Sequence, residues 1–224
     1  MISYRKLAMR VLGHSPVSAV KTARRSTGKR AAALALTAAL VVGMTLPAFA
    51  LPWYIEDGDI SISAGESGNK VVQNGEEKAA NDTDTVIKSN YPSTASEHTV
   101  TINAEEGKTV DVTLNNVTIN VDEGYKYGYD PNAYKTAVSV TGSGNTNIEL
   151  NGNNTLTSGY GHAGLEHNKT DDSGTLTITD NDNDGKLDAK GGTGIGGGYA
   201  NDGQVTITGG TITATGTNGG AGIG

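Results

Sequence analysis

The acidic run DNDNDG at residues 180–185 has residue types and a spacing that could bind a metal ion. Acids at alternate positions followed by a glycine resemble the start of a calcium loop, in which oxygen atoms surround the ion. The candidate ligands are Asp180, Asp182, Asp184 and Asp188. Gly191 stands at the twelfth position, where such loops place a bidentate glutamate. Because Asn, Asp and Gly also form tight turns without an ion, a plain turn between two strands is the alternative. No other cofactor is predicted.

The segment 122–135, DEGYKYGYDPNAYK, could bind a sugar through aromatic side chains. It holds four of the nine tyrosines: Tyr125, Tyr127, Tyr129 and Tyr134. The first three alternate with other residues, so an extended backbone would present their rings on one side, about 6.6 Å apart. Tyrosine offers an apolar face to the C–H groups of a sugar and a hydroxyl to its polar edge. The segment is therefore a candidate glycan site, and the alternative is a loop whose tyrosines pack down on the protein.

Short strands separated by glycine-rich turns must position these side chains. From Thr99 onward, apolar residues alternate with polar ones in runs such as VTITGGTITATG, which is typical of strands with one buried face. Blocks of three such runs recur along the chain, and the last block begins again at Ala221. Three short strands in a repeat of this length indicate a parallel β-helix. An antiparallel β-sandwich is the alternative architecture, but it gives no reason for the same block to recur.

The repeats predict an all-β fold, a right-handed parallel β-helix with three short strands per coil. Its coils cover residues 99–224, and the sequence is expected to be truncated in mid-repeat at Gly224. Residues 51–98 are less regular and are expected to form an N-terminal cap over the open end of the core. Stacking the coils predicts two internal columns, Ile148–Leu176–Val205 and Leu156–Leu187–Ile212.

The blocks GTLTITDNDNDGKLDAKGG, TGIGGG and VTITGGTITATGTNGGAGIG resemble the repeats of secreted surface proteins of Gram-positive gut bacteria. Many of those proteins are catalogued as carbohydrate-binding-domain-containing proteins. The resemblance covers nearly all of the chain after residue 50. It implies a right-handed parallel β-helix on an exported protein, and it carries no residue-level ligand motif.

The parallel β-helix also occurs in polysaccharide-degrading enzymes, and the residues here argue against that activity. After residue 50 the chain has no arginine, which enzymes resembling pectate lyases use as a base. His162 lies in a sequence, GHAG, that only approximates the Gly-His-Gly motif of polygalacturonases. No two carboxylates are expected on one face of neighbouring coils, as a general acid and base would require. We predict a non-catalytic protein in which His162 is a turn residue.

The first 50 residues differ in character from the rest of the chain. Eight basic residues and no acid precede an apolar run, residues 31–46, and the small-residue sequence Ala48-Phe49-Ala50 follows. This order is typical of a secretory signal peptide, and cleavage is expected after Ala50. A retained membrane anchor is the alternative, although the apolar run is short for a membrane span.

Without the leader, the chain has nine lysines against 24 acids, a formal charge of −15. Because nucleic-acid affinity comes largely from neutralised phosphates, this charge excludes a nucleic-acid partner. The absence of cysteine excludes disulfides and thiolate metal sites. We therefore expect a secreted bacterial surface protein without a membrane span after processing. Its expected role is binding of a polysaccharide or a host or cell-wall glycan, or adhesion; the alternative is a structural stalk with no ligand of its own.

Overall fold

The computed structural model describes residues 51–125 and 134–224 of the chain. By its internal contacts the chain divides into Met1–Phe49 and Ala50–Gly224, and all described residues lie in the second unit. Apart from a single 3-10 turn, η1 (Ile55–Asp57), every described element is a β-strand. No helix in the described ranges is long and apolar enough to span a membrane.

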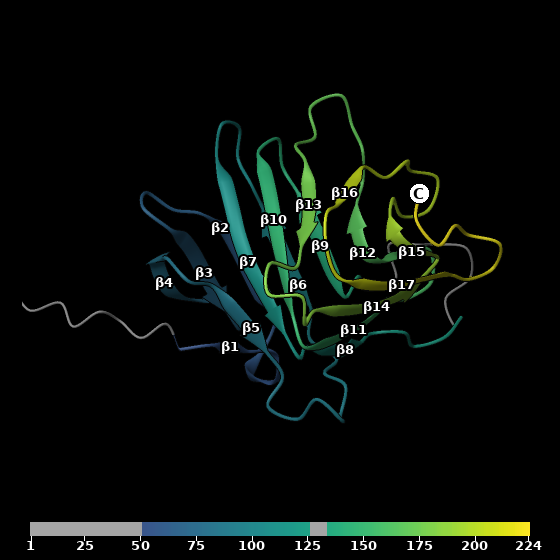
Figure 1. Cartoon of the computed structure of the whole chain (residues 1–224), viewed down its shortest axis with the longest axis horizontal. Coiled ribbons are helices and arrows are strands. Elements are labelled where there is room, and N and C mark those ends of the chain that lie inside the picture. Colours follow the sequence, from purple (N-terminus) through teal and green to yellow (C-terminus); the bar gives the residue numbers. More distant parts are fainter. Residues whose placement is uncertain (1–50, 126–133) are drawn as a thin grey trace, which may run out of the picture. The chain divides into compact units, whose positions relative to one another are not determined.

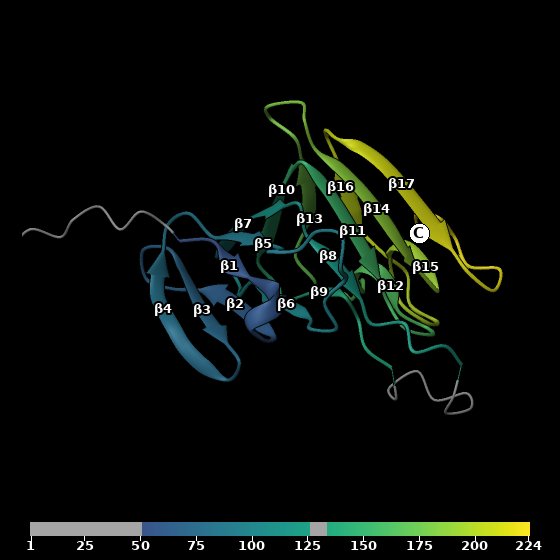
Figure 2. The same cartoon turned by 90° about the horizontal axis from the view of Figure 1, so that it is seen from below.

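The strands form three sheets, which we name A, B and C (Figure 1). Sheet A is entirely parallel, in the order β1 (Trp53–Tyr54), β5 (Val86–Lys88), β7 (Thr109–Asn115), β10 (Asn145–Asn151), β13 (Leu176–Thr179) and β16 (Val205–Ile207). Sheet C is also parallel, in the order β17 (Thr211–Gly216), β14 (Lys186–Gly191), β11 (Asn153–Thr157) and β8 (Thr118–Asn120) (Figure 2).

Sheet B has a parallel part and an antiparallel part. The parallel part runs β15 (Thr193–Gly196), β12 (Ala163–His167), β9 (Val138–Thr141), β6 (Val100–Asn103) and β2 (Ile60–Ala64). The strands β3 (Asn69–Gln73) and β4 (Glu76–Asp82) extend it in antiparallel fashion. From β6 onward the chain visits sheets B, A and C in the same order four times, and we call each such set of three strands a circuit.

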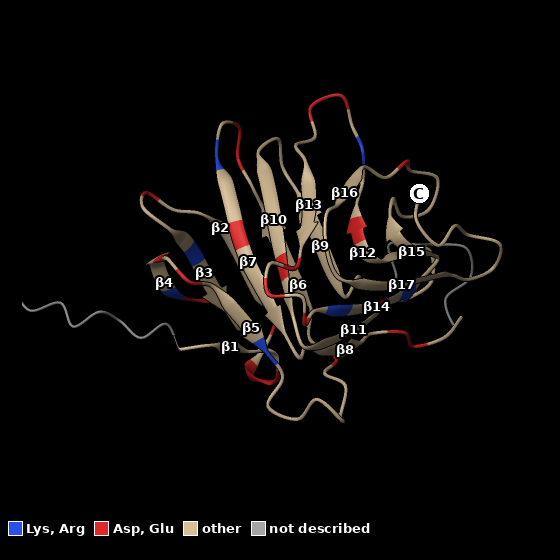
Figure 3. Cartoon of the chain, viewed as in Figure 1, with Lys and Arg blue, Asp and Glu red and all other residues tan. Residues whose placement is uncertain are grey.

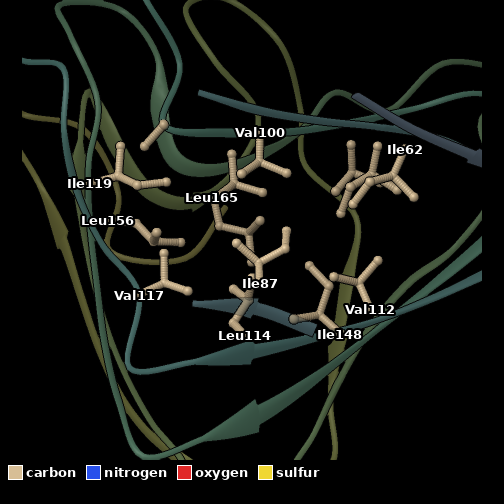
Figure 4. Packing of buried hydrophobic residues seen from close by; sticks show 14 of the residues in the cluster. Ile62, Ile87, Val100, Val112, Leu114, Val117, Ile119, Ile148, Leu156 and Leu165 are labelled. Carbon is tan, nitrogen blue, oxygen red and sulfur yellow. The ribbon is translucent and has the colours of Figure 1, made fainter. Parts of the chain in front are cut away.

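The core lies between the three sheets, because the alternating apolar side chains of each strand point inward. In sheet B, the parallel register stacks Ile60, Val100, Val138, Leu165 and Ile195 in one column. Figure 4 shows side chains from all three sheets turned toward one another, among them Val100 and Leu165 of sheet B, Leu114 and Ile148 of sheet A, and Ile119 and Leu156 of sheet C. Burial of such side chains contributes roughly 2 kcal/mol each, so the stacked arrangement supplies the main stabilising term.

The register differs from the predicted columns at one step in sheet A and at one step in sheet C. Ile148 pairs with Ile178, and Leu176 pairs with Thr146 instead. In sheet C, Leu156 pairs with Ala189, and Leu187 pairs with Asn154. The sequence alignment was wrong by two residues at these steps because it matched the first apolar residue of each strand with the first apolar residue of the next. The structure buries two polar residues there, Thr146 and Asn154.

Residues 51–98 are more regular than the sequence suggests. Three of their strands continue the parallel sheets, since β2 pairs with β6, β5 pairs with β7, and β1 pairs with β5. Trp53 packs against the core, and its indole Nε1 donates a hydrogen bond to Asp82 Oδ2 at 2.6 Å. The outermost strand, β4, contains the ion pair Lys78–Glu76, and its Glu77 pairs with Lys70 of β3. Charges on such an edge oppose pairing with another chain.

Thr146→Val should raise the stability of the protein. In the described part of the chain, Thr146 Oγ1 is a buried side-chain oxygen with no hydrogen-bond partner, and an unsatisfied buried hydroxyl costs about 1 kcal/mol or more. Valine has a similar shape without this cost, so the melting temperature should rise by about 3 °C. Thermal unfolding followed by circular dichroism measures the change. Thr101→Val, on the exposed face of β6, is the control and should change little; a lower melting temperature for Thr146→Val would contradict the assignment.

Candidate functional site

The turns that lead from sheet C to sheet B differ strongly in length, and we call them the C-to-B corners. After β8 the connection covers residues 121–137, of which 126–133 lie outside the described residues, and after β11 the corner spans 158–162. After β17, residues 217–222 lead to Ile223, which forms a parallel bridge with Ile195 of β15. Between β14 and β15 the corner consists of Gly192 alone. A Cβ atom at Gly192 would lie 3.2 Å from the backbone of Gly161, so glycine is the residue that fits this tight corner. The short corner leaves a depression between its longer neighbours.

Two adjoining hollows, of ≈340 Å³ and ≈180 Å³, occupy this depression. They share three lining residues, Tyr160, Thr217 and Asn218, and we call them together the tyrosine groove. The larger hollow is also lined by Gly192, Gly198 and Tyr199, and the smaller by Tyr125, Asp122 and Lys190. The larger hollow alone is within the range of about 300–1,000 Å³ that is common for ligand sites.

Tyr125, one of the four tyrosines of the predicted glycan site, lines the groove together with two tyrosines that sequence analysis missed. Tyr125 is 61% exposed, and its ring packs edge-on against Tyr160 with centroids 5.1 Å apart. Tyr199, half exposed, lines the larger hollow. The available signal for both missed residues was their position in glycine-rich turns, GYGH and GGGYAN, where little neighbouring side-chain bulk covers a ring.

The other predicted tyrosines do not all belong to the groove surface. Tyr134 is only 8% exposed, with its ring centroid 5.5 Å from that of Tyr160, so it packs down on the protein as the alternative interpretation of that segment expected. Tyr127 and Tyr129 lie outside the described residues. The expected row of three rings spaced about 6.6 Å apart can therefore be compared with the structure only at Tyr125.

The described lining residues of the groove include one positive and one negative side chain. No described residue that lines the larger hollow is charged, and the smaller hollow has one cation, Lys190, and one carboxylate, Asp122. A ligand in this groove meets tyrosine rings, backbone amides of glycines, and the polar side chains of Thr217 and Asn218. These groups suit an uncharged ligand that has both apolar faces and hydroxyls.

The predicted calcium ligands are only partly brought together. The carboxylates of Asp180 and Asp182 lie with that of Glu149, so that one oxygen of each is within 4.8 Å of the others. Glu149 comes from β10, where it pairs with Thr179, and sequence analysis did not connect it with this loop. We call Glu149, Asp180 and Asp182 the trio, and Asp184 and Asp188 are not part of it. Asp184 Oδ1 accepts a hydrogen bond from the backbone N–H of Gly152, and Asp188 lies on β14 in sheet C.

The loop 180–185 is also held together by its own hydrogen bonds. Asp180 Oδ1 accepts the backbone N–H groups of Asp184 and Gly185 at 3.1 and 3.0 Å. Glu149 accepts the backbone and side-chain N–H groups of Asn181 at 2.6 and 2.7 Å, and the hydroxyl of Thr179. These contacts support the turn interpretation, in which the acids order the loop without an ion.

If the trio binds calcium, millimolar calcium should raise the melting temperature, because an ion bound only to the folded state stabilises it by mass action. Glu149→Gln should then abolish the gain, whereas Asp188→Asn should keep it. Calorimetry with calcium and with a chelator measures both. The loop is a plain turn if the wild-type melting temperature does not move at several millimolar calcium.

Asp182→Asn should raise the melting temperature at pH 7 in the presence of a chelator. Desolvation, and next the carboxylate of Asp184, raise the pKa of Asp182. A folded-state pKa above the unfolded value means that protonation stabilises the fold, and that this stabilisation is lost as the pH rises through the folded-state pKa. Asparagine removes the charge, so its advantage should be present at pH 7 and absent at about pH 3, below the ordinary aspartate pKa of about 3.9. An equal effect at both pH values would contradict this origin.

The outer face of sheet A holds paired carboxylates, which corrects the expectation from the sequence. Asp84, Asp111 and Glu149 line one hollow of ≈400 Å³ on this face, and Figure 3 shows the acidic positions of β7 and β10 on neighbouring strands. Glu149 pairs with Thr113, so Asp111 and Glu149 lie two positions apart on neighbouring strands and face the same side of the sheet. Asp111 Oδ1 accepts a hydrogen bond from Asn147 Nδ2 at 2.8 Å. None of the described residues that line this hollow is aromatic.

His162 lies in the corner that carries Tyr160, directly before β12. Its Nδ1 atom is 2.8 Å from Glu166 Oε2 and 2.8 Å from Thr136 Oγ1. This position agrees with the expected turn residue, and the contact with Glu166 adds a buried partner that the sequence did not predict.

Comparison of the chain with protein-family models, with curated proteins and with solved structures found no match.

Proposed function

We propose that the strands form a right-handed parallel β-helix in which each circuit is one coil. The fixed order of the sheets, the parallel pairing of β6 to β17 and the internal columns support this proposal. The resemblance of the repeats to those of secreted bacterial surface proteins supports it as well. In such a helix the C-to-B corners stack along one side, which explains why one short corner produces a groove.

We propose further that the protein is non-catalytic and that the tyrosine groove binds a neutral glycan. The observation that carries this proposal is the larger hollow, in which Tyr160 and Tyr199 line an uncharged depression between glycine-rich turns. A sugar presents an apolar C–H face and a polar rim, and a tyrosine offers a matching ring and hydroxyl. The side chains of Thr217 and Asn218 line both hollows, and a hydroxyl and an amide can hydrogen-bond to sugar hydroxyls.

Binding to three hexasaccharides of different charge tests this function. Isothermal titration of the chain from Leu51 onward should show binding of the glucose hexamer or the N-acetylglucosamine hexamer. The galacturonate hexamer should bind at least tenfold more weakly, because the acidic chain repels it. Equal binding of galacturonate would contradict a neutral-sugar groove. If none of the three hexamers binds, and a broad glycan array is also negative, the structural-stalk alternative is favoured.

A polysaccharide-degrading enzyme is a second candidate, favoured by the carboxylates in the hollow of sheet A. Two carboxylates on one face are what glycoside hydrolysis uses as acid and base or nucleophile. Incubation of the same hexamers with the protein, followed by product sizing, separates the two functions. Our proposal expects intact hexamers; shorter products that disappear in Glu149→Gln would assign the chemistry to sheet A.

We also propose that the protein is exported and is cleaved after Ala50. The basic start, the apolar run and the Ala48-Phe49-Ala50 sequence support this localisation. N-terminal sequencing of protein secreted by a bacterial host should give Leu51 as the first residue. Recovery of an uncleaved chain in the membrane fraction would favour the membrane-anchor alternative.

A further inference from the structure

The side chain of Glu166 on β12 lies between the two segments that carry the tyrosines of the larger hollow. It is only 6% exposed and is not itself a lining residue. We propose that Glu166 is a positioning residue of the tyrosine groove, whose carboxylate holds the turn with Tyr160 and the loop with Tyr199 at a fixed separation. This inference rests on the proposed function of the groove.

One oxygen of Glu166 binds the turn that carries Tyr160. Glu166 Oε2 accepts the backbone N–H of Ala163 at 3.0 Å and lies 2.8 Å from His162 Nδ1. Because a carboxylate only accepts hydrogen bonds, the histidine nitrogen is the donor. The backbone N–H of His162 in turn donates to Gly159 O at 3.2 Å, which closes the turn around Tyr160.

The other oxygen binds the loop that carries Tyr199. Glu166 Oε1 accepts Asn168 Nδ2 at 3.1 Å, and Asn168 Oδ1 accepts the backbone N–H of Gly198 at 2.7 Å. The next residue, Tyr199, donates its backbone N–H to Gly161 O at 2.6 Å. A Cβ at Gly198 would lie 2.6 Å from Glu166 Oε2, so the absence of a side chain there lets the loop approach the carboxylate.

The direction of these hydrogen bonds makes the network sensitive to single-atom changes. A buried carboxylate is costly unless hydrogen bonds compensate it, and here both of its oxygens are used. In Glu166→Gln, the new amide can keep its oxygen on the Ala163 and His162 side. Its NH₂ group would then face the NH₂ group of Asn168, and two donors cannot bond to each other. The hydrogen bonds that run through Asn168 to Gly198 should be lost, while the hydrogen bond with His162 is kept.

A reciprocal exchange restores the pattern. In Glu166→Gln combined with Asn168→Asp, the glutamine NH₂ donates to one aspartate oxygen, and the other aspartate oxygen accepts the Gly198 N–H. Each single variant should break the hydrogen bond between residues 166 and 168. Glu166→Gln places two NH₂ donors opposite each other, and Asn168→Asp places two carboxylate acceptors opposite each other. A role that depended only on side-chain volume would not show this rescue, because the changes are nearly isosteric.

The test measures hydrogen exchange of the Gly198 and Tyr199 amides by NMR, and the dissociation constant for whichever of the glucose and N-acetylglucosamine hexamers binds the wild type more tightly. Each single variant should speed exchange at least tenfold and weaken binding at least fivefold, and the double variant should restore both within a factor of about two of the wild type. Should Glu166→Gln not fold, Asn168→Ala removes the same hydrogen bonds to Gly198 and should likewise speed amide exchange and weaken binding.

Two outcomes overturn the inference: single variants with unchanged exchange, or a double variant no better than the singles. If exchange follows the expected pattern but neither hexamer binds even the wild type, the positioning network stands and the glycan function fails.

Discussion

Asn154→Ala should lower the free energy of unfolding by about 3 kcal/mol. Asn154 is 2% exposed and points into the core of sheet C, in the column between β8 and β14. Its Oδ1 accepts the backbone N–H of Val117 at 3.0 Å, and its Nδ2 donates to Asn151 O and Lys186 O, both at 3.2 Å. One side chain thus joins three successive circuits. Alanine removes the acceptor of a buried amide, which costs about 1–3 kcal/mol, and the two further bonds add to the loss.

Urea denaturation measures this loss, and Asn154→Leu separates its causes. Leucine fills the space beside Leu187 but offers no hydrogen bond. If the buried backbone groups cause the loss, leucine should destabilise the protein about as much as alanine. If leucine recovers most of the stability, side-chain packing and not the three hydrogen bonds of Asn154 accounts for the loss in Asn154→Ala.

Replacing Tyr125 and Tyr199 together with alanine should weaken glycan binding at least tenfold, which corresponds to about 1.4 kcal/mol. Both rings are at least half exposed and line the two hollows of the groove. Alanine would remove most of the apolar surface offered to a sugar while leaving the buried Tyr134 in place. Because exposed side chains contribute little to folding, the melting temperature should remain nearly constant.

Tyr91→Ala is the matched control for this variant. Tyr91 is 66% exposed and belongs to the segment before β6, and it lines neither hollow of the groove. Its replacement should leave the dissociation constant unchanged. Loss of binding in Tyr91→Ala, or intact binding in the double variant, would mean that the glycan site lies outside the tyrosine groove.

The class of fold could be predicted from the sequence because alternation of apolar and polar residues directly reports a half-buried strand. The coarse result, an all-β protein with parallel sheets, is confirmed. The register could not be predicted fully. Asn154 and Thr146 take inward positions that an alignment of apolar residues skips. Asn154 is held there by hydrogen bonds to backbone groups of its own circuit and of the circuits on either side.

The site was predictable only where its residues are close in sequence. Tyr125 was identified because its segment is rich in tyrosine. Tyr160 and Tyr199 were missed because they belong to different circuits: Tyr160 lies in the corner between β11 and β12, and Tyr199 in the loop between β15 and β16. They line one hollow only because the circuits stack. Glu149 joins Asp180 and Asp182 for the same reason, since β10 lies beside β13. Each of these contacts depends on the register, which the sequence did not define.

The most direct test of the account is NMR mapping of glycan binding on the chain from Leu51 onward. Addition of the glucose or N-acetylglucosamine hexamer should shift the backbone amides of Gly192, Gly198, Tyr199 and Asn218, which line the tyrosine groove. The amides of Asp111 and Glu149 on sheet A should remain in place. Shifts confined to sheet A, or no shift at saturating concentrations of either hexamer, would contradict a glycan site in the groove.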